Sequence, residues 1–335
     1  MPPAVRGLGH LSLSVAPAVL LVAAALGATR TVEIVPTPVI WLIALPAIGC
    51  VGYVAGLEAD AVFRGWESAS ASATPDAADV ATVLAVAAGA VFTRLLAVDL
   101  GLGVVVAAAL LGLLADRTRP SYGAAVYCGA FVGMASPALF GELTAVTAAG
   151  ILAGVVFVAA EQVFDGFGGK LGTTAFVGCA AVALALGVDG GSGSAVPGSI
   201  AAEYVLAGAA AAGITYISSV HLEHGPVQAS ALVGLVGGLV CPALLTAGEG
   251  VAAAVFCASF AGMARPGRVP GLGAMVVAGA LCGVLVAATS PVLVGFGGKL
   301  GTIAFVACLV GRGLLAVGAD AFPAALPTPA DGLGS

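Results

Sequence analysis

The stretch GFGGKLGTTAFVGC at residues 166–179 returns almost unchanged as GFGGKLGTIAFVAC at residues 295–308. Working outward from it, residues 128–187 align without a gap with residues 257–316, and 28 of the 60 positions are identical. An unbroken match of the eight residues GFGGKLGT does not arise by chance between two apolar segments. The chain therefore contains an internal repeat, with one copy in each half of the sequence.

The composition excludes a soluble protein. Of the 335 residues, 60% are hydrophobic and 8% are charged, and the mean hydropathy is +1.14. A soluble domain carries about 25% charged residues. The 50 glycines indicate closely packed membrane helices, and a net charge of -6 leaves no basic patch for nucleic acid. We therefore expect an all-α, polytopic integral membrane protein with the lipid bilayer as its partner.

Hydrophobic segments follow one another along almost the whole chain. A bilayer core of about 30 Å requires about 20 apolar residues in a helix, and twelve segments approach that length, of which we expect 10–12 to span. They lie near residues 11–28, 37–57, 77–93, 101–115, 122–140, 143–161, 171–188, 203–220, 229–247, 251–264, 272–289 and 300–318.

The repeat and one polar stretch divide these segments into groups. The polar stretch, residues 58–79, is acidic and rich in Ala and Ser, which predicts a flexible linker or an interfacial segment carrying Trp66. Each copy of the repeat contains five hydrophobic segments. We therefore expect two accessory transmembrane helices in 1–57, a linker in 58–79, membrane repeat 1 in 80–190, membrane repeat 2 in 203–318, and a flexible C-terminal tail in 319–335.

The orientation of the two repeats is predicted from their segment number and from charge. Units with an odd number of spans insert in opposite directions. With a cytoplasmic N-terminus and twelve spans, seven Lys and Arg residues face the cytoplasm and three face outside, as the positive-inside rule requires. We expect inverted repeats in a multi-pass protein of the plasma membrane. If the third segment of each unit is re-entrant, the repeats are parallel and the count becomes six to four, so this alternative stays open.

The motif GFGGKLGT predicts an anion-binding turn in each repeat. Its glycines expose backbone N–H groups where a helix should begin, and a helix N-terminus attracts anions. The Lys in the first turn would be stabilised by an anion, and the Thr hydroxyl adds a donor. The alternative is a tight connection whose Lys reaches lipid phosphates. The candidate substrate-binding residues are Gly168, Gly169, Lys170, Thr173, Gly297, Gly298, Lys299 and Thr302.

This turn resembles the Gly-Gly-x-Gly re-entrant loops of sodium-coupled carboxylate symporters, which include the 2-hydroxycarboxylate and glutamate families. The resemblance covers Gly168–Thr173 and Gly297–Thr302 only, and the spacing here is one residue longer. It implies an architecture of two five-helix units.

Prolines and acids supply candidates for ion coupling. Pro137 and Pro266 follow the sequences GMAS and GMAR, and a proline in a membrane helix frees carbonyls that can bind a cation. Glu161 and Asp165 flank the first glycine-rich turn, and a carboxylate in a span is a proton or cation site. The alternatives are an ordinary helix kink for the prolines and solvation at a helix end for the acids.

Other chemistry finds little support in the sequence. The run His221–His224 offers two imidazoles to a metal, but it falls in a predicted loop, and the seven cysteines favour packing over thiol chemistry. Enzyme signatures such as His-Glu-x-x-His, Gly-x-Ser-x-Gly or a nucleotide loop are absent from the sequence. We therefore expect no enzyme, no catalytic residue, no metal site and no cofactor.

Two hypotheses for the function remain. The first is a membrane transporter or channel, preferably a secondary transporter of a small anion or carboxylate with its site between the repeats. The second is a non-transporting membrane scaffold or a subunit of a membrane complex. Substrate, coupling ion and oligomeric state are not determined by the sequence.

Overall fold

The chain is helical throughout the part that the structure describes. The computed structural model describes residues 3–31, 37–68 and 76–321. Over these residues the chain forms twelve α-helices and no β-strand, and two helices continue into a π-helical turn. Seven helices are long and apolar enough to cross a membrane, and three more apolar helices are shorter, at 10–17 residues. This fold agrees with the predicted class, a helical membrane protein.

Each of the twelve predicted hydrophobic segments overlaps one helix. The helices are α1 (Pro3–Thr31), α2 (Thr37–Ser68), α3 (Ala77–Arg94), α4 (Val104–Thr118), α5 (Pro120–Gly133), α6 (Leu143–Ala159), α7 (Lys170–Leu186), α8 (Gly198–Tyr216), α9 (Pro226–Leu244), α10 (Gly248–Ala261), α11 (Gly271–Thr289) and α12 (Lys299–Ala321). The π-helical turns η1 (Leu95–Asp99) and η2 (Ile217–His221) follow α3 and α8 directly.

Helices enter the predicted linker in 58–79 from both of its ends. Helix α2 continues to Ser68, and α3 begins at Ala77 behind a capping box formed by Asp76 and Asp79. The part of this stretch that α2 includes contains Glu58, Arg64 and Glu67, which are good helix formers, so polarity alone does not end the helix there. At the other end of the chain, α12 extends to Ala321, and the rest of the predicted tail in 319–335 lies outside the described residues.

Small residues let the helices approach one another closely. Gly129 of α5 lies against the Val86 carbonyl of α3, and Gly208 of α8 lies against Gly279 of α11. Helices in a bilayer gain little from the hydrophobic effect between them, because lipid is as apolar as their side chains. Close packing over small residues therefore stabilises the bundle, which explains the glycine content.

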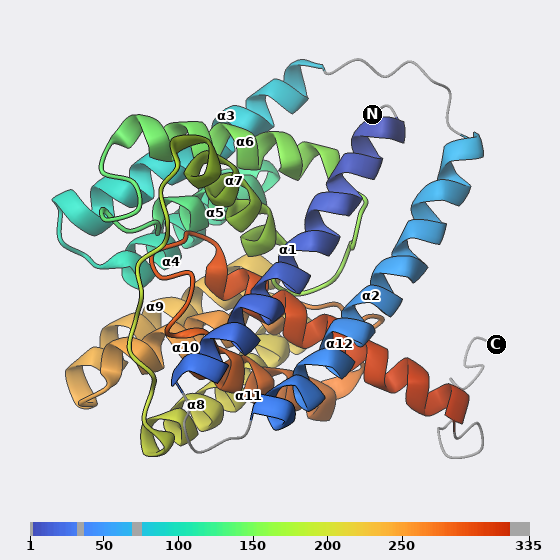
Figure 1. Cartoon of the computed structure of the whole chain (residues 1–335). Helices are drawn as coiled ribbons and strands as arrows, with labels where there is room; N and C mark the ends of the chain where they lie inside the picture. Colours follow the sequence, from blue (N-terminus) through green and yellow to red (C-terminus); the bar gives the residue numbers. More distant parts are fainter. Residues whose placement is uncertain (1–2, 32–36, 69–75, 322–335) are drawn as a thin grey trace.

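The helices form two groups, with α3–α7 in the upper half of Figure 1 and α8–α12 in the lower half. Corresponding positions of the two groups share unusual backbone angles. Phe164 and Leu293, each two residues before a GFGGKLGT motif, both have a φ of 51°, which is uncommon for residues other than glycine. Gly103 and Gly225, immediately before α4 and α9, have φ values of 76° and 78°. The two groups therefore share backbone angles also at α4 and α9, whose sequences match each other in hydropathy alone.

Helices α4 and α9 occupy corresponding places in the two groups and pack against each other. Val105, near the start of α4, lies against Gly238 near the end of α9. Arg117, near the end of α4, donates to Gln228 near the start of α9, over 3.1 Å. The two helices are therefore antiparallel.

The accessory helices α1 and α2 lie on one side of both groups (Figure 1). Gly9 of α1 lies against the Ala159 carbonyl at the end of α6. Helix α2 packs on α12, and its Glu58 forms an ion pair with Arg268 of the second group over 2.6 Å. The accessory helices thus contact both groups.

Candidate functional site

The two GFGGKLGT turns meet at the centre of the molecule. Helices α7 and α12 cross where Gly172 and Gly301 lie against each other, and a Cβ on either glycine would overlap the Cα of the other. The start of α7 lies beside the Phe305 amide of α12, and the start of α12 lies beside the Phe176 amide of α7. This second pair of corresponding helices is therefore also antiparallel.

Each turn is held by the third helix of the other group. Gly168 lies against the Phe260 and Ala261 carbonyls at the end of α10, and Gly297 lies against the corresponding carbonyls at the end of α5. The Arg265 N–H donates to the Gly166 carbonyl over 2.9 Å. In the mirrored contact, the N–H of residue 136 donates to the carbonyl of residue 295 over 2.9 Å. Gly168 and Gly297 therefore permit a close contact between the two groups of helices.

The second glycine of each pair has a different role. Gly169 and Gly298 have φ values of 81° and 79°, in the left-handed region that glycine adopts without strain. Each immediately precedes the first residue of α7 or α12. The sharp turn that starts these two helices therefore requires glycine at these positions.

The two threonines of the motif face the helix backbone. Thr173 Oγ1 donates to the Gly169 carbonyl and Thr302 Oγ1 donates to the Gly298 carbonyl, each over 3.2 Å. Both side chains are fully buried. Bonds of this kind, to the carbonyl four residues earlier, are common for threonine in helices. Neither hydroxyl proton is directed at a ligand in this arrangement.

The two lysines cap the helices that precede them. Lys170 Nζ donates to the carbonyl of Glu161, just after α6, over 2.9 Å. Lys299 Nζ donates to the carbonyl of Thr289, the last residue of α11, and to that of Val292 just beyond it, over 2.6 Å each. A helix C-terminus carries partial negative charge and is stabilised by a cation. The conflict that the sequence indicates, a lysine at a helix N-terminus, is thus offset by the C-terminus of the neighbouring helix.

Each lysine also lines a cavity beside the crossing of α7 and α12. The Lys170 cavity has a volume of about 260 Å³ and the Lys299 cavity about 150 Å³. Both are lined by Phe131 of α5 and Phe260 of α10. These two rings, with centroids 4.6 Å apart, therefore form a wall shared by the two cavities.

The charges of the two cavities differ. Lys170 shares its cavity with Arg265, Glu161 and Asp165, and Asp165 is paired with Arg265 over 2.5 Å. Among the described residues, Lys299 is the one charged residue that lines its own cavity. The first cavity is therefore balanced in formal charge, whereas the second is positive.

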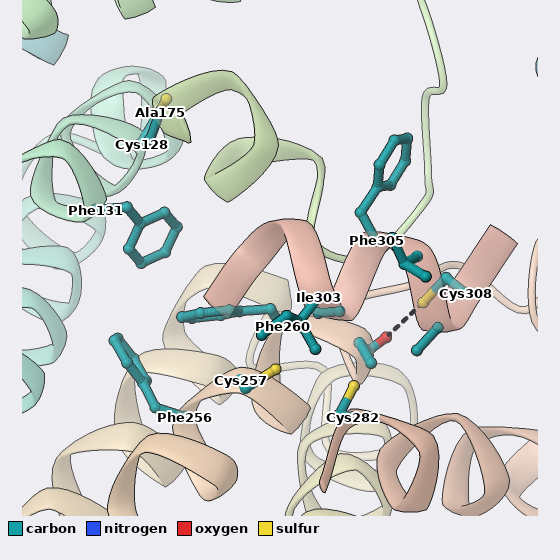
Figure 2. Close-up of a cluster of buried hydrophobic side chains, with 14 of the residues drawn as sticks. Cys128, Phe131, Ala175, Phe256, Cys257, Phe260, Cys282, Ile303, Phe305 and Cys308 are labelled. Carbon is teal, nitrogen blue, oxygen red and sulfur yellow. Dashed lines mark hydrogen bonds between the residues drawn. The ribbon is translucent and has the colours of Figure 1, made fainter. Parts of the chain in front are cut away.

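The shared wall is part of a larger aromatic cluster, which the sequence analysis did not identify. Figure 2 shows Phe131, Phe256 and Phe260 facing one another between α5 and α10. Tyr127 completes the cluster, 4.4 Å from Phe131 and 6.1 Å from Phe260 between ring centroids. Its signal in the sequence is an aromatic pair spaced by four residues in both copies of the repeat.

A chain of buried hydroxyl groups crosses between the groups beside this cluster. Tyr127 Oη lies 3.2 Å from Ser230 Oγ, which lies 2.9 Å from Ser259 Oγ. Ser259 in turn donates to the Phe256 carbonyl over 2.7 Å. Every hydroxyl of this chain therefore has a hydrogen-bond partner, and the chain stabilises the contact of α5 with α9 and α10.

The candidates for ion coupling lie in different surroundings. Glu161 and Asp165 are exposed and line the Lys170 cavity. The carbonyls on either side of Pro137 are occupied, because buried Arg94 donates to Ala135 and Phe140 over 3.0 Å each. A guanidinium therefore stands where the sequence predicted a cation, and the corresponding carbonyls around Pro266 have no such partner among the described residues.

The remaining sequence candidates have local partners. His224 Nδ1 lies 3.3 Å from Ser218 Oγ, and the described residues contain no group of three or more His, Cys, Asp and Glu that could hold a metal ion. Cys128 and Cys257 donate to the carbonyls of Leu171 and Leu300, over 3.2 and 3.1 Å. The two thiols thus help to hold the first turns of α7 and α12.

Comparison with known proteins identifies no relative. No family model, no curated protein and no solved structure matches the chain. The function is therefore inferred from the geometry of the site.

Proposed function

We propose that the chain is a membrane transporter or channel for a small anion, which binds where α7 and α12 begin. One observation carries the proposal: two cavities lie beside the crossing of these helices, each has a lysine, and Phe131 and Phe260 form a wall of both. Access to a central site from two sides is what a transport protein needs.

The first turns of α7 and α12 supply the chemistry for an anion. The N–H groups of a helix's first turn have no partner within the helix and carry partial positive charge. Residues Lys170–Gly172 line the first cavity and Lys299–Gly301 line the second. The Lys299 cavity has no carboxylate among its described lining residues, so we propose it as the stronger anion site.

The candidate substrate-binding residues then divide into two sets. Lys170, Lys299, Gly169 and Gly298 line the cavities and remain in the proposed site. The other four candidates pack between or within the groups and serve the structure. They are Gly168, Gly297, Thr173 and Thr302.

We infer further that the two groups are repeats with inverted topology. The antiparallel packing of α4 with α9 and of α7 with α12 supports this, because two corresponding helices that cross a membrane in opposite directions are related by an axis in its plane. In this arrangement the two cavities open toward opposite sides of the plasma membrane, and the N-terminus is cytoplasmic. Rocking of one group against the other would expose the cavities in turn.

Labelling tests the inverted topology. Single cysteines are placed at Asp189, after α7, and at Gly267, in the loop after α10, in a background without other cysteines. Each should react with a charged reagent that is added on one side of the membrane and not with the same reagent added on the other. Because 189 follows the fifth helix of the first group, its label should react from the same side as one at Pro197 before α8. A label at Asp189 that reacts from the same side as one at Asp76, before α3, would leave an even number of spans between them and contradict the inversion.

Flux measurements test the transport function. The full chain, purified and reconstituted in liposomes, should carry at least one small anion from a series of halides, nitrate, formate and acetate. Lys299→Ala should lower that flux by roughly ten- to a hundredfold, because a hydrogen bond to a charged group contributes about 1.5–3 kcal/mol. Lys299→Arg should retain charge but lose fit. Equal flux in the wild type and both variants would contradict the proposed site.

A second candidate function, a non-transporting membrane scaffold, is favoured by one observation. Both lysines and both threonines of the motif have hydrogen-bond partners inside the protein. If the folded, reconstituted chain carries none of the tested anions, the scaffold is the better interpretation.

A further inference from the structure

The loops that follow α5 and α10 have the same backbone turn. In the first loop, the N–H groups of Leu139 and Phe140 donate to the Ser136 carbonyl over 3.0 Å each. In the second loop, residues 268 and 269 donate to the carbonyl of residue 265 over 2.8 and 3.2 Å. All three positions correspond in the gapless alignment of the two repeats. The two loops therefore share one hydrogen-bonded turn.

In the first loop a positive charge occupies two of these carbonyls. Arg94, at the end of α3, is buried and donates through Nη1 to the Ala135 carbonyl and through Nη2 to the Phe140 carbonyl. One guanidinium bridges both oxygens at 3.0 Å. The turn thus directs two carbonyl oxygens at a single point.

In the second loop the same carbonyls have no donor within the described part of the chain. Ala264 and Val269 correspond to Ala135 and Phe140, and they are only 1% and 2% exposed. Tyr216 stands before η2 where Arg94 stands before η1, and no hydrogen bond joins its hydroxyl to either carbonyl. A buried carbonyl without a partner is costly and is usually satisfied by a group that completes it.

We propose that a monovalent metal cation, Na⁺ or K⁺, binds between the carbonyl oxygens of Ala264 and Val269. It takes the place that the Arg94 guanidinium occupies in the first loop. Backbone carbonyls alone are typical ligands of K⁺, whereas protein sites for Ca²⁺ and Mg²⁺ usually include carboxylates. The inference is independent of the proposed anion transport, because it concerns a different loop and a different charge.

The charges around the second loop permit a cation there. Arg265 and Arg268 belong to the loop, but Arg265 is paired with Asp165 and Arg268 with Glu58. Each arginine is therefore balanced by a carboxylate. Because both carboxylates form these ion pairs, the oxygens that remain to bind the cation are neutral.

A third oxygen lies at the same end of α10. Thr215, the residue before Tyr216, packs against Gly262 and is fully buried, and its hydroxyl has no hydrogen-bond partner among the described residues. The corresponding Thr93 in the first half is also buried without a described partner, although Arg94 follows it. Thr215 is therefore a candidate third ligand that a matched substitution of Thr93 can test.

Thermal unfolding of the purified full chain tests the site. We compare NaCl, KCl and N-methylglucamine chloride at equal ionic strength. Na⁺ or K⁺ should raise Tm saturably by roughly 5 °C over N-methylglucamine, because a ligand that binds only the folded state stabilises it. Direct binding of radioactive sodium or rubidium, as a K⁺ analogue, gives a second measurement that does not depend on unfolding.

Exchanging the two residues before the π-helical turns provides matched variants. Tyr216→Arg places a guanidinium at the second loop and should abolish cation binding and the dependence of Tm on Na⁺ or K⁺. Arg94→Tyr empties the first loop and should add a second cation-dependent rise in Tm. Thr215→Val should weaken radioactive cation binding several-fold, and Thr93→Val should leave it unchanged.

Either of two results would overturn the proposal. If Tm is the same in all three salts and no radioactive cation binds the folded wild-type chain, the two carbonyls are satisfied by water. Cation binding that persists unchanged in a folded Tyr216→Arg variant would also contradict the site, because the cation would then bind elsewhere.

Discussion

The Lys170 cavity and the Lys299 cavity share a backbone plan and a wall but differ in charge. Both lie at the start of a helix that crosses its counterpart at Gly172 and Gly301. Lys170 has carboxylates around it, whereas Lys299 is the one charge among the described residues of its cavity. The backbone of each turn is fixed by contact with the other turn, while the side chains that face a cavity are free to diverge. Similarity between the two turns therefore reflects their packing, whereas the cavities differ in side chains that this packing does not fix.

Breaking the crossing should have the largest effect. Gly301→Leu forces a side chain into the Gly172 backbone, where even a Cβ has no room, so we expect no folded protein. Gly301→Ala should lose about 3 kcal/mol or more of stability by overpacking. Gly311→Ala on the same helix is the control, because a Cβ there meets no atom within 4 Å. Thermal stability in detergent measures all three, and equal stability of the two Ala variants would contradict the close crossing.

Opening the shared wall should join the two cavities. Phe260→Ala removes a ring that lines both, and we expect a leak of small anions at least about tenfold faster than in the wild type, since loss of about 1.4 kcal/mol from a barrier is tenfold in rate. Phe92→Ala is the control, because Phe92 is 56% exposed on the outside of α3. Liposome efflux measures both variants. An unchanged rate in a folded Phe260→Ala protein would show that the ring is no barrier.

Removing the lysines one at a time sharpens the comparison of the cavities. Lys299→Ala leaves two carbonyls without their donor, one at the end of α11 and one just beyond it, and Lys170→Ala leaves one after α6. We expect a loss of about 1–3 kcal/mol for Lys299→Ala and less for Lys170→Ala. Thermal unfolding of both variants checks the order. The opposite order would mean that the acids around Lys170 contribute more than the helix ends.

The ion pairs beside the Lys170 cavity should give the smallest effects. The Glu58–Arg268 pair is mostly buried, whereas both partners of the Asp165–Arg265 pair are more than half exposed. Glu58→Gln should therefore cost about 1–2 kcal/mol and loosen α2, and Asp165→Asn should cost less than about 1 kcal/mol. Limited proteolysis between α2 and α3, together with Tm, measures both. A larger effect at Asp165 would assign it a role beyond its surface pair.

Several features follow from the sequence because they depend on local composition. Twelve apolar segments predict twelve helices, since each segment's preference for lipid over water is a property of its own side chains. The repeat is visible as identical residues. Phe131 and Phe260 also carry a signal, an aromatic four residues after another in both copies, but the spacing alone does not show that the two pairs face each other.

The sequence by itself indicated the helical membrane class, the positions of the helical segments and the 28 identities between residues 128–187 and 257–316. The tertiary structure decided what the duplicated residues touch. Arg94 is buried against the loop after α5, and Thr173 faces its own helix. Gly172 meets its own counterpart in the other repeat, Gly301. Hydropathy and spacing predict which residues of a helix are buried. They do not predict which residues these contact, because the contacts depend on the packing of helices far apart in the chain.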